Sequence, residues 1–210
     1  MKDRLMEENE NIHDKLKELF GLNTGSFNII QRQIDVDLQM EYFDLSREVK
    51  KDLDTGLVLS EADKLFDDET GIEEKKLLLA RLASIQDVKA FRTIEDFYRD
   101  TPDEITEWTA LAYQESRMLL ESHILDQNQV LISTGLGGKG EKLRYFVVLL
   151  GRSENSFSDV QKKVIKNEFS YALKRHDSEI EDFNFSESMA TIKAVIPMKE
   201  PVKAVFQEAL

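Results

Sequence analysis

Apolar residues recur every three to four positions through most of the first 125 residues, which is the spacing of one face of an α-helix. Residues 12–20 predict a short helix that ends at Gly21, where a left-handed C-terminal cap is common. In residues 27–53 a strand-like alternation competes with the helical period. We favour a helix for this whole segment, because its helical series is longer and ends near Gly56.

Three more helices are expected at residues 60–66, 73–85 and 88–98. Asp87 precedes the last of these and is placed to cap it. The run Thr101-Pro102-Asp103-Glu104 then combines a cap residue, a first-turn proline and a carboxylate at the third position. We expect a long helix to begin there and to continue to about Ser122.

The pattern changes to strands after Asp126. Residues 129–134 and 143–150 predict a hairpin around GLGGKGEK, a helix follows at 158–175, and residues 180–185 and 189–196 predict a second hairpin before a helix at 201–209. The expected fold is therefore α+β, with an acidic all-helical domain at residues 1–126 and a small α+β domain with an antiparallel sheet and two helices at residues 127–210.

The segment 73–120 resembles a HEAT-like repeat. EEKKLLLARLASIQDVKAFRTIEDFYRD gives a helix, a turn and a second helix, and TPDEITEWTALAYQESR is similar to the start of another unit. The resemblance implies stacked helix pairs that act as a protein-binding scaffold. An ordinary helical bundle is the alternative interpretation.

Residues 144–210 follow the order β, α, β, β, α, which resembles a ferredoxin-like domain without its last strand, a place that residues 129–134 could fill. RYFVVLLGRSENSFSDVQKKVIKNEF also resembles the opening of an ACT-type regulatory domain. That resemblance implies an effector site around Gly151, Asn155 and Ser156. The chain stops at Leu210 inside an expected helix without a cap, so the sequence leaves open whether this is its natural end.

The net charge of -13 is carried by the first part of the chain, because 12 Lys and Arg stand against 11 Asp and Glu from Gln127 onward. Such an acidic surface repels a phosphate backbone and argues against nucleic-acid binding. It favours a basic protein partner, with Glu104, Glu107 and Trp108 as candidate contacts; packing in the core is the alternative for the aromatic residue. No apolar run predicts a membrane span, and the absence of Cys agrees with a cytoplasmic location.

Sites for chemistry are few. The loop GLGGKGEK offers Gly135, Gly137, Gly138 and Lys139 to an anion or a partner, but it lacks the order of a Walker loop and is also explained as a hairpin turn. The acidic run DDETGIEE fails calcium-loop spacing, because its first ligand position would be Phe66. We therefore expect no metal and no cofactor.

The three His residues are far apart in the sequence, and no catalytic motif is present, so an enzyme is the less favoured interpretation. The favoured function is a non-enzymatic interaction or regulatory protein that binds a protein partner through its acidic helical region. Its C-terminal sheet would join that contact or pair with itself in a homodimer. The alternative is a small-molecule sensor with an effector bound in the ACT-like domain.

Overall fold

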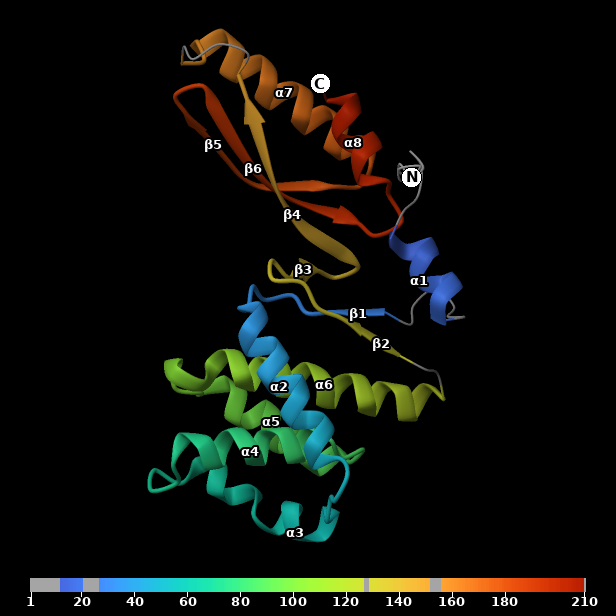
Figure 1. Ribbon diagram of the computed structural model, residues 1–210, viewed down its shortest axis with the longest axis vertical. Coiled ribbons are helices and arrows are strands. Elements are labelled where there is room, and N and C mark those ends of the chain that lie inside the picture. The colour runs from blue at the N-terminus through green and yellow to red at the C-terminus, as the bar shows by residue number, and fades with distance from the viewer. Residues whose placement is uncertain (1–11, 21–26, 127–128, 152–155, 210) are drawn as a thin grey trace, which may run out of the picture. The chain divides into compact units, whose positions relative to one another are not determined.

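The computed structural model describes residues 12–20, 27–126, 129–151 and 156–209 (Figure 1). The chain is a mixed α+β protein that divides into two compact units. The helical unit comprises residues 26–135, and the sheet unit comprises residues 1–25 together with 136–210. The divisions thus fall at 25/26 and 135/136 rather than at 126/127, because the first helix lies with the C-terminal sheet and the strand after Asp126 lies with the helices.

The helical unit is built from short and medium-length helices closed by one pair of strands. Its elements are β1 Phe27–Ile29, α2 Val36–Val49, α3 Thr55–Ser60, the 3-10 helix η1 Ala62–Phe66, α4 Ile72–Ala83, α5 Val88–Arg99, the 3-10 helix η2 Asp103–Ile105, α6 Thr106–Leu125 and β2 Val130–Ile132. Their order does not by itself distinguish a HEAT-like repeat from a bundle.

Two helix starts illustrate how far local signals determine these elements. The carboxylate of Asp87 accepts hydrogen bonds from the backbone N–H groups of Lys89 and Ala90, so the predicted cap of α5 is confirmed. The predicted cap at Thr101 is wrong. Its hydroxyl donates instead to the carbonyl of Phe97 at 2.6 Å, and a 3-10 turn comes before α6.

The strands of the helical unit correct two predictions. The segment 27–53 is not one helix: Phe27–Ile29 is a strand, and Asp35 caps α2 by accepting from the N–H of Asp37 at 2.9 Å. Residues 129–134 do not form a hairpin with 143–150, because β2 pairs in parallel with β1. The backbone bond from Ile30 N to Ile132 O, 2.9 Å long, extends this pair by one residue.

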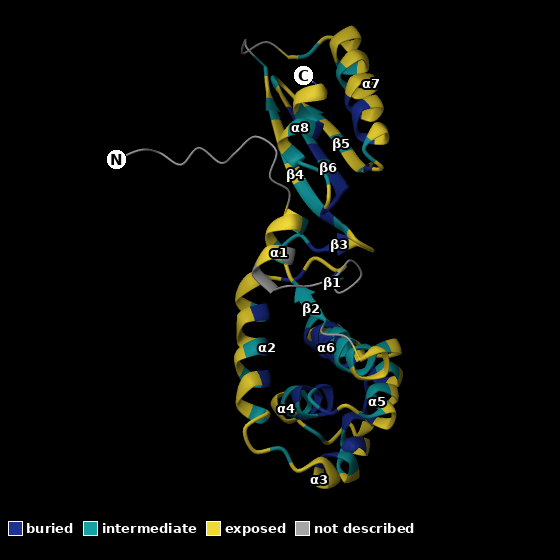
Figure 2. Cartoon of the chain, turned by 90° about the vertical axis from the view of Figure 1, so that its right-hand side faces the viewer, coloured by how far each residue is buried: buried dark blue, intermediate teal, exposed yellow. Residues whose placement is uncertain are grey.

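The core of the helical unit lies between α2, α4, α5 and α6. Figure 2 shows that the buried positions of α2 are on the side facing α4 and α6. Tyr42 and Trp108 meet there edge to face with ring centroids 5.2 Å apart, and Leu79, Leu82 and Leu111 are fully buried around them. Each such aliphatic side chain contributes about 1.5–3 kcal/mol through its removal from water.

The sheet unit combines a four-stranded antiparallel sheet with three helices. Its elements are α1 Ile12–Phe20, β3 Gly138–Lys139, β4 Lys142–Leu150, α7 Asp159–Arg175, β5 Glu179–Ser186, β6 Met189–Pro197 and α8 Val202–Glu208. The strand order is β3-β4-β6-β5. The predicted second hairpin and the predicted helix 158–175 are confirmed, the latter with a complete capping box at Ser158 and Gln161.

One face of this sheet is covered by α7 and α8, as Figure 1 shows. Phe169 and Leu173 of α7 and Val205 of α8 pack against Ile192 and Ile196 of β6. Strands β4 and β5 lie on either side of β6, and α7 connects them. Residues 129–134 do not supply a further strand beside β4, because they belong to the helical unit.

Across the described ranges, every helix is too short or too polar to pass through a lipid bilayer.

Candidate functional site

The helical unit gathers two loops at one of its ends. Helices α4 and α6 begin at this end, because the indole N–H of Trp108 in α6 donates to the carbonyl of Lys76 in α4 at 3.0 Å. Helix α5 finishes here, since the ring of Phe97 meets the ring of Phe66 edge to face, with centroids 5.7 Å apart. The chain on either side of Phe66 and of Asp100 therefore lies on one surface.

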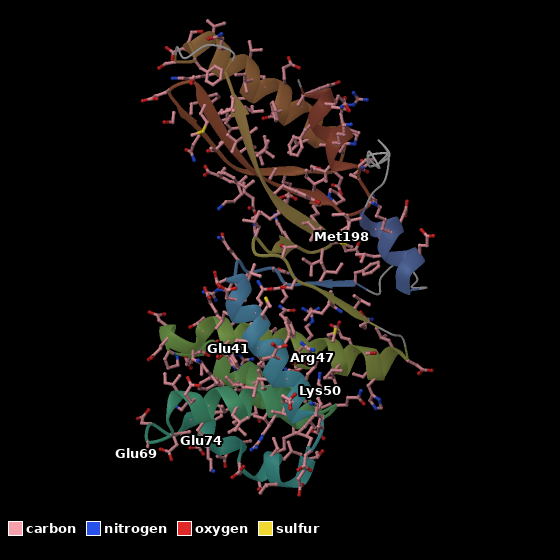
Figure 3. The ribbon with its side chains drawn as sticks, in the orientation of Figure 1. Glu41, Arg47, Lys50, Glu69, Glu74 and Met198 are labelled. Atoms are coloured by element: carbon pink, nitrogen blue, oxygen red, sulfur yellow. The ribbon has the colours of Figure 1, made fainter. Side chains whose placement is uncertain are left out.

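This surface holds a large share of the acidic residues, and we call residues 63–74 and 95–107 together the acidic end. They contain 12 Asp and Glu against 2 Lys and Arg, whereas the whole helical unit contains 24 against 12. Figure 3 labels Glu69 and Glu74 at this end, where α4 begins. Half of the unit's carboxylates thus lie in these two ranges with one sixth of its cations; Lys75 and Lys76 follow the first range directly, and Lys76 is paired with Glu73.

Many of these carboxylates have no cation beside them. In the described part of the chain, Asp67, Asp68, Glu69, Asp100 and Asp103 are exposed and form no ion pair. Acidic residues in first helical turns are accounted for by the helix dipole, but these five include four that lie outside any helix. Their charge is therefore available to a molecule that approaches from solvent.

A large aromatic ring lies among these charges. Phe66, the last residue of η1, is 53% exposed, although its edge rests on Phe97. The Nζ atom of Lys75 lies 5.9 Å from the centre of the Phe97 ring, so a cation already occupies the vicinity of the inner aromatic. An exposed ring of this size beside several charged residues is typical of an interface residue.

The residues predicted for a partner contact are divided by the structure. Glu104 is exposed and Glu107 is half-buried at the acidic end, where neither forms an ion pair with a described residue. Trp108 is 2% exposed, and its ring packs against Tyr42, so it cannot touch a partner while the unit is folded. The prediction for Trp108 is corrected to a core position, because its large ring fills the space between α2 and α4.

Sequence reasoning missed a buried polar cluster between α2 and α6. The carboxylate of Glu115, in α6, accepts hydrogen bonds of 2.6 Å from the hydroxyls of Tyr42 and Ser46 and from the ammonium of Lys50. Burial, and then the charge of Glu115, raise the pKa of the Tyr42 hydroxyl well above its usual value. The three donors, two in α2 and one at its C-cap, are spaced four residues apart, a spacing that sequence reasoning could have used.

This cluster is structural in character. Glu115 is 3% exposed and all three donors point at it, so no donor or acceptor is directed at a substrate. Lys50 alone reaches solvent, where it lines a shallow groove together with Leu53, Ser84 and Leu119. The cluster holds α2 to α6 and leaves no group poised for proton transfer.

The glycine-rich loop forms a tight hairpin, and anion binding there stays a prediction. Gly138 and Lys139 form β3 and pair with Leu143 and Lys142 of β4, so the hairpin turn that we expected is present at Gly140, with φ of 60°. The ammonium of Lys139 lies 2.6 Å from Glu179 and is neutralised there. Gly137 is buried, and its carbonyl accepts from the N–H of Arg144.

The remaining glycine of the predicted anion set lies in the helical unit. Gly135 belongs to the helical unit, where a Cβ atom at its position would approach Cγ2 of Val36 to 3.0 Å. The close approach of α2 therefore accounts for a glycine at this position.

The predicted effector loop is only partly described. The N–H of Gly151 donates to the carbonyl of Ser188 at 2.7 Å, so this amide is already used in closing the sheet. Ser156 is exposed, and Asn155 lies outside the described residues. Effector binding at this loop stays a prediction.

His176 has a carboxylate partner at each of its two ring nitrogens. It follows α7, with Nδ1 2.6 Å from Glu200 and Nε2 2.9 Å from Glu208. Hydrogen bonds to Glu208 and then to Glu200 raise the pKa of His176 above its usual value. These contacts join the end of α7 to α8.

Within the ranges that the structure describes, no three His, Asp or Glu residues are grouped so as to hold a metal ion. Comparison of the chain with protein-family models, with curated proteins and with solved structures finds no match.

Proposed function

We propose that this protein is a non-enzymatic interaction protein whose acidic end binds a basic segment of another protein. The observation that carries the proposal is the exposed ring of Phe66, which lies among carboxylates that form no ion pair with a described residue. Charge and apolar area therefore occur together on one surface.

The two features have different physical roles. Unpaired carboxylates attract a cationic surface over about 8–10 Å at physiological salt and so raise the rate of encounter. Their contribution to the final affinity is small, because exposed ion pairs are screened by water. The ring of Phe66 can lose water on contact and so slows dissociation, as buried aromatic residues do at interfaces.

The chemistry of the surface selects the kind of partner. Carboxylates repel nucleic-acid phosphates, and their spacing around Phe66 does not match a calcium loop. A partner segment that presents Lys or Arg on both sides of an apolar side chain can cover the Phe66 ring and pair with the carboxylates at the same time. We therefore propose a basic amphipathic segment as the bound element.

We also propose that the sheet unit is a ferredoxin-like domain whose outer position beside β4 is unfilled. The order β4-β6-β5, with α7 connecting β4 to β5, supports this arrangement. In such a domain one more strand would pair with β4, where this chain supplies only the two residues of β3.

The test of the partner site uses a synthetic amphipathic peptide of Lys and Leu, with the corresponding Glu and Leu peptide as negative control. Binding is measured by calorimetry at several salt concentrations. We expect Phe66→Ala to weaken binding roughly tenfold without changing the salt dependence. The triple variant Asp67→Asn, Asp68→Asn, Glu69→Gln is expected to weaken it by a similar factor and to reduce the salt dependence.

A matched control removes the same charge from elsewhere in the helical unit. Glu48→Gln, Asp52→Asn and Asp126→Asn neutralise three exposed carboxylates outside the acidic end. This control is expected to change the affinity less than about threefold. Equal losses in the two triple variants would show attraction to the net charge alone and would contradict the site, as would the absence of saturable binding.

A further inference from the structure

Strand β4 has the composition of a strand from the middle of a sheet. Residues 145–150 read YFVVLL, six apolar or aromatic residues in succession, which is typical of a strand buried on both faces. In the structure neither face of this stretch is fully covered. Phe146 and Leu150 are 55% and 76% exposed on one face, and Tyr145, Val147 and Leu149 are half-buried on the other.

The outer edge of β4 is unpaired along this stretch. Strand β3 pairs only with Lys142 and Leu143, and the N–H of Arg144 then donates to Gly137 on the same side. Beyond Arg144 no described strand pairs with this edge. Backbone groups alternate in direction along a strand, so the N–H and C=O groups of Phe146, Val148 and Leu150 point outward as those of Arg144 do.

The opposite edge of the sheet is protected in the way that edge strands usually are. Strand β5 has a bulge between Ile180 and Asp182, and it carries Glu179, Glu181 and Asp182. Bulges and charges at an edge prevent another strand from pairing there. Residues 145–150 of β4 have no charge, no proline and no bulge. One edge therefore excludes a partner strand, and the other is suited to receive one.

We propose that the partner of this edge is a second copy of the same chain, paired antiparallel through β4 with Val148 opposite Val148. In this register Phe146 of each copy lies opposite Leu150 of the other. All three outward-facing residues are then paired, with about six backbone hydrogen bonds across the interface. Within residues 146–150 all cross-strand neighbours are apolar, so no charge is buried in that stretch.

The symmetry of this pairing extends an apolar surface. An antiparallel junction within one sheet has its two-fold axis perpendicular to the sheet, so both pairs of covering helices lie on the same side. On the opposite face, the side chains of Phe146, Val148 and Leu150 from the two copies lie side by side and form one apolar stripe. Met189, which lies opposite Leu150 in the β4–β6 ladder, adjoins this stripe.

The charge of the sheet unit does not oppose a second copy as the occupant of this edge. The sheet unit contains 16 Lys and Arg against 17 Asp and Glu, so two such units have almost no net repulsion. The segment that pairs is uncharged, and it gives matched apolar neighbours when it meets its own sequence in reverse direction. The inference concerns a different unit from the acidic end and does not depend on the function proposed for that end.

The oligomeric state of the full chain tests this proposal. Sedimentation equilibrium is expected to give a concentration-dependent mass that approaches twice the 24.3 kDa of the chain. Val148→Lys puts two like charges opposite one another and is expected to weaken the dimer at least about tenfold. The matched control Val164→Lys adds the same charge at an exposed Val of α7 and is expected to leave the dimer unchanged.

Met189→Lys separates edge pairing from stacking of the two apolar faces. It places a charge on the same face of the sheet but on β6, which is paired on both sides. Edge pairing predicts a smaller effect than that of Val148→Lys. A monomer at every concentration, a dimer that tolerates Val148→Lys, or equal disruption by Met189→Lys would each overturn the proposal.

A crosslinking measurement keeps the proposal testable if the charged variant is unstable. The chain has no Cys, so Val148→Cys introduces a single thiol beside its symmetry mate. Mild oxidation, or a short thiol crosslinker, is expected to give a covalent dimer in high yield at concentrations where the chain dimerises. Val164→Cys is the control and should crosslink little. Equal yields from the two variants would exclude the Val148 junction.

Discussion

The Nζ atom of Lys50 lies 2.6 Å from Oε1 of Glu115, and this pair joins a half-exposed cation to a carboxylate inside the helical unit. A carboxylate in such a place is stable only while its donors remain, because water cannot replace them. The stability of the helical unit should therefore depend strongly on one acidic residue.

Glu115→Gln is expected to lower the free energy of unfolding by about 2–4 kcal/mol, because an amide cannot accept from all three donors and directs its own N–H groups at them. Lys50→Met should also lower the free energy of unfolding, because it leaves the buried carboxylate of Glu115 with the two hydroxyls but without its counter-charge. Urea denaturation followed by circular dichroism measures both.

The control Glu121→Gln, in an exposed pair with Arg117, should change stability by less than about 1 kcal/mol. A loss at Glu115 no larger than the loss at Glu121 would contradict the structural importance of the cluster.

The sheet unit should lose stability as the pH rises through the titration of His176. Glu208 and Glu200 raise the folded-state pKa of His176, so the protonated ring is bound more tightly in the folded state. This contribution is complete below the unfolded pKa of about 6.5 and disappears as the pH passes the raised folded value. An NMR titration of the ring should give a pKa above that of an unfolded control, and His176→Gln should remove this part of the pH dependence. A ring pKa at or below the unfolded value would show that the contacts to α8 do not form.

Neutralising the acidic end should stabilise the helical unit slightly. Asp67, Asp68 and Glu69 repel one another and have no cation in the described structure, so the triple change to amides removes repulsion of about 0.2–0.5 kcal/mol per close pair. Thermal unfolding at low salt is the measurement, and the difference should shrink at high salt. If these carboxylates stabilised the fold, the triple variant would unfold at a lower temperature than the unchanged protein. An increase in the unfolding temperature is expected if they serve a partner instead.

The two helix starts should respond differently to alanine. Asp87→Ala removes an acceptor of two backbone N–H groups and is expected to cost about 1 kcal/mol. Thr101→Ala removes only a bond back to the preceding helix and should cost less than Asp87→Ala. Denaturant unfolding of the two variants measures both losses. A loss for Thr101→Ala as large as that for Asp87→Ala would contradict the assignment of Asp87 as the stronger cap.

Individual helices could be predicted from the sequence where a capping residue directly precedes a helical repeat of apolar residues. Ser158 and Asp87 each precede such a period, and the helices that follow them begin as predicted. Strands β5 and β6 were recognised for the same reason, because their alternation is bounded by turn residues on both sides.

The errors concern segments whose partners are distant in the sequence. Ile30 and Ile34 fit a helical period and are both buried, yet the chain around Ile30 is held extended by Ile132. Nothing in the residues near Ile30 encodes that bond. The cluster around Glu115 was missed for a similar reason, since an acidic residue in a helix is usually exposed and only its packing against α2 makes it buried. The acidic end could be counted from the sequence, but the exposed position of Phe66 within it could not.

The division of the chain has a consequence for the order of events during synthesis. The helical unit occupies one continuous stretch, so all of its contacts, including the parallel pair of β1 and β2, can form before the remaining residues leave the ribosome. The sheet unit is interrupted by that stretch, and the bond from His13 N to Met198 O can close only when nearly the whole chain has been made. Helix α1 can therefore make its contact with Met198, just after β6, only after the inserted unit has been synthesised, so the sheet unit is completed last.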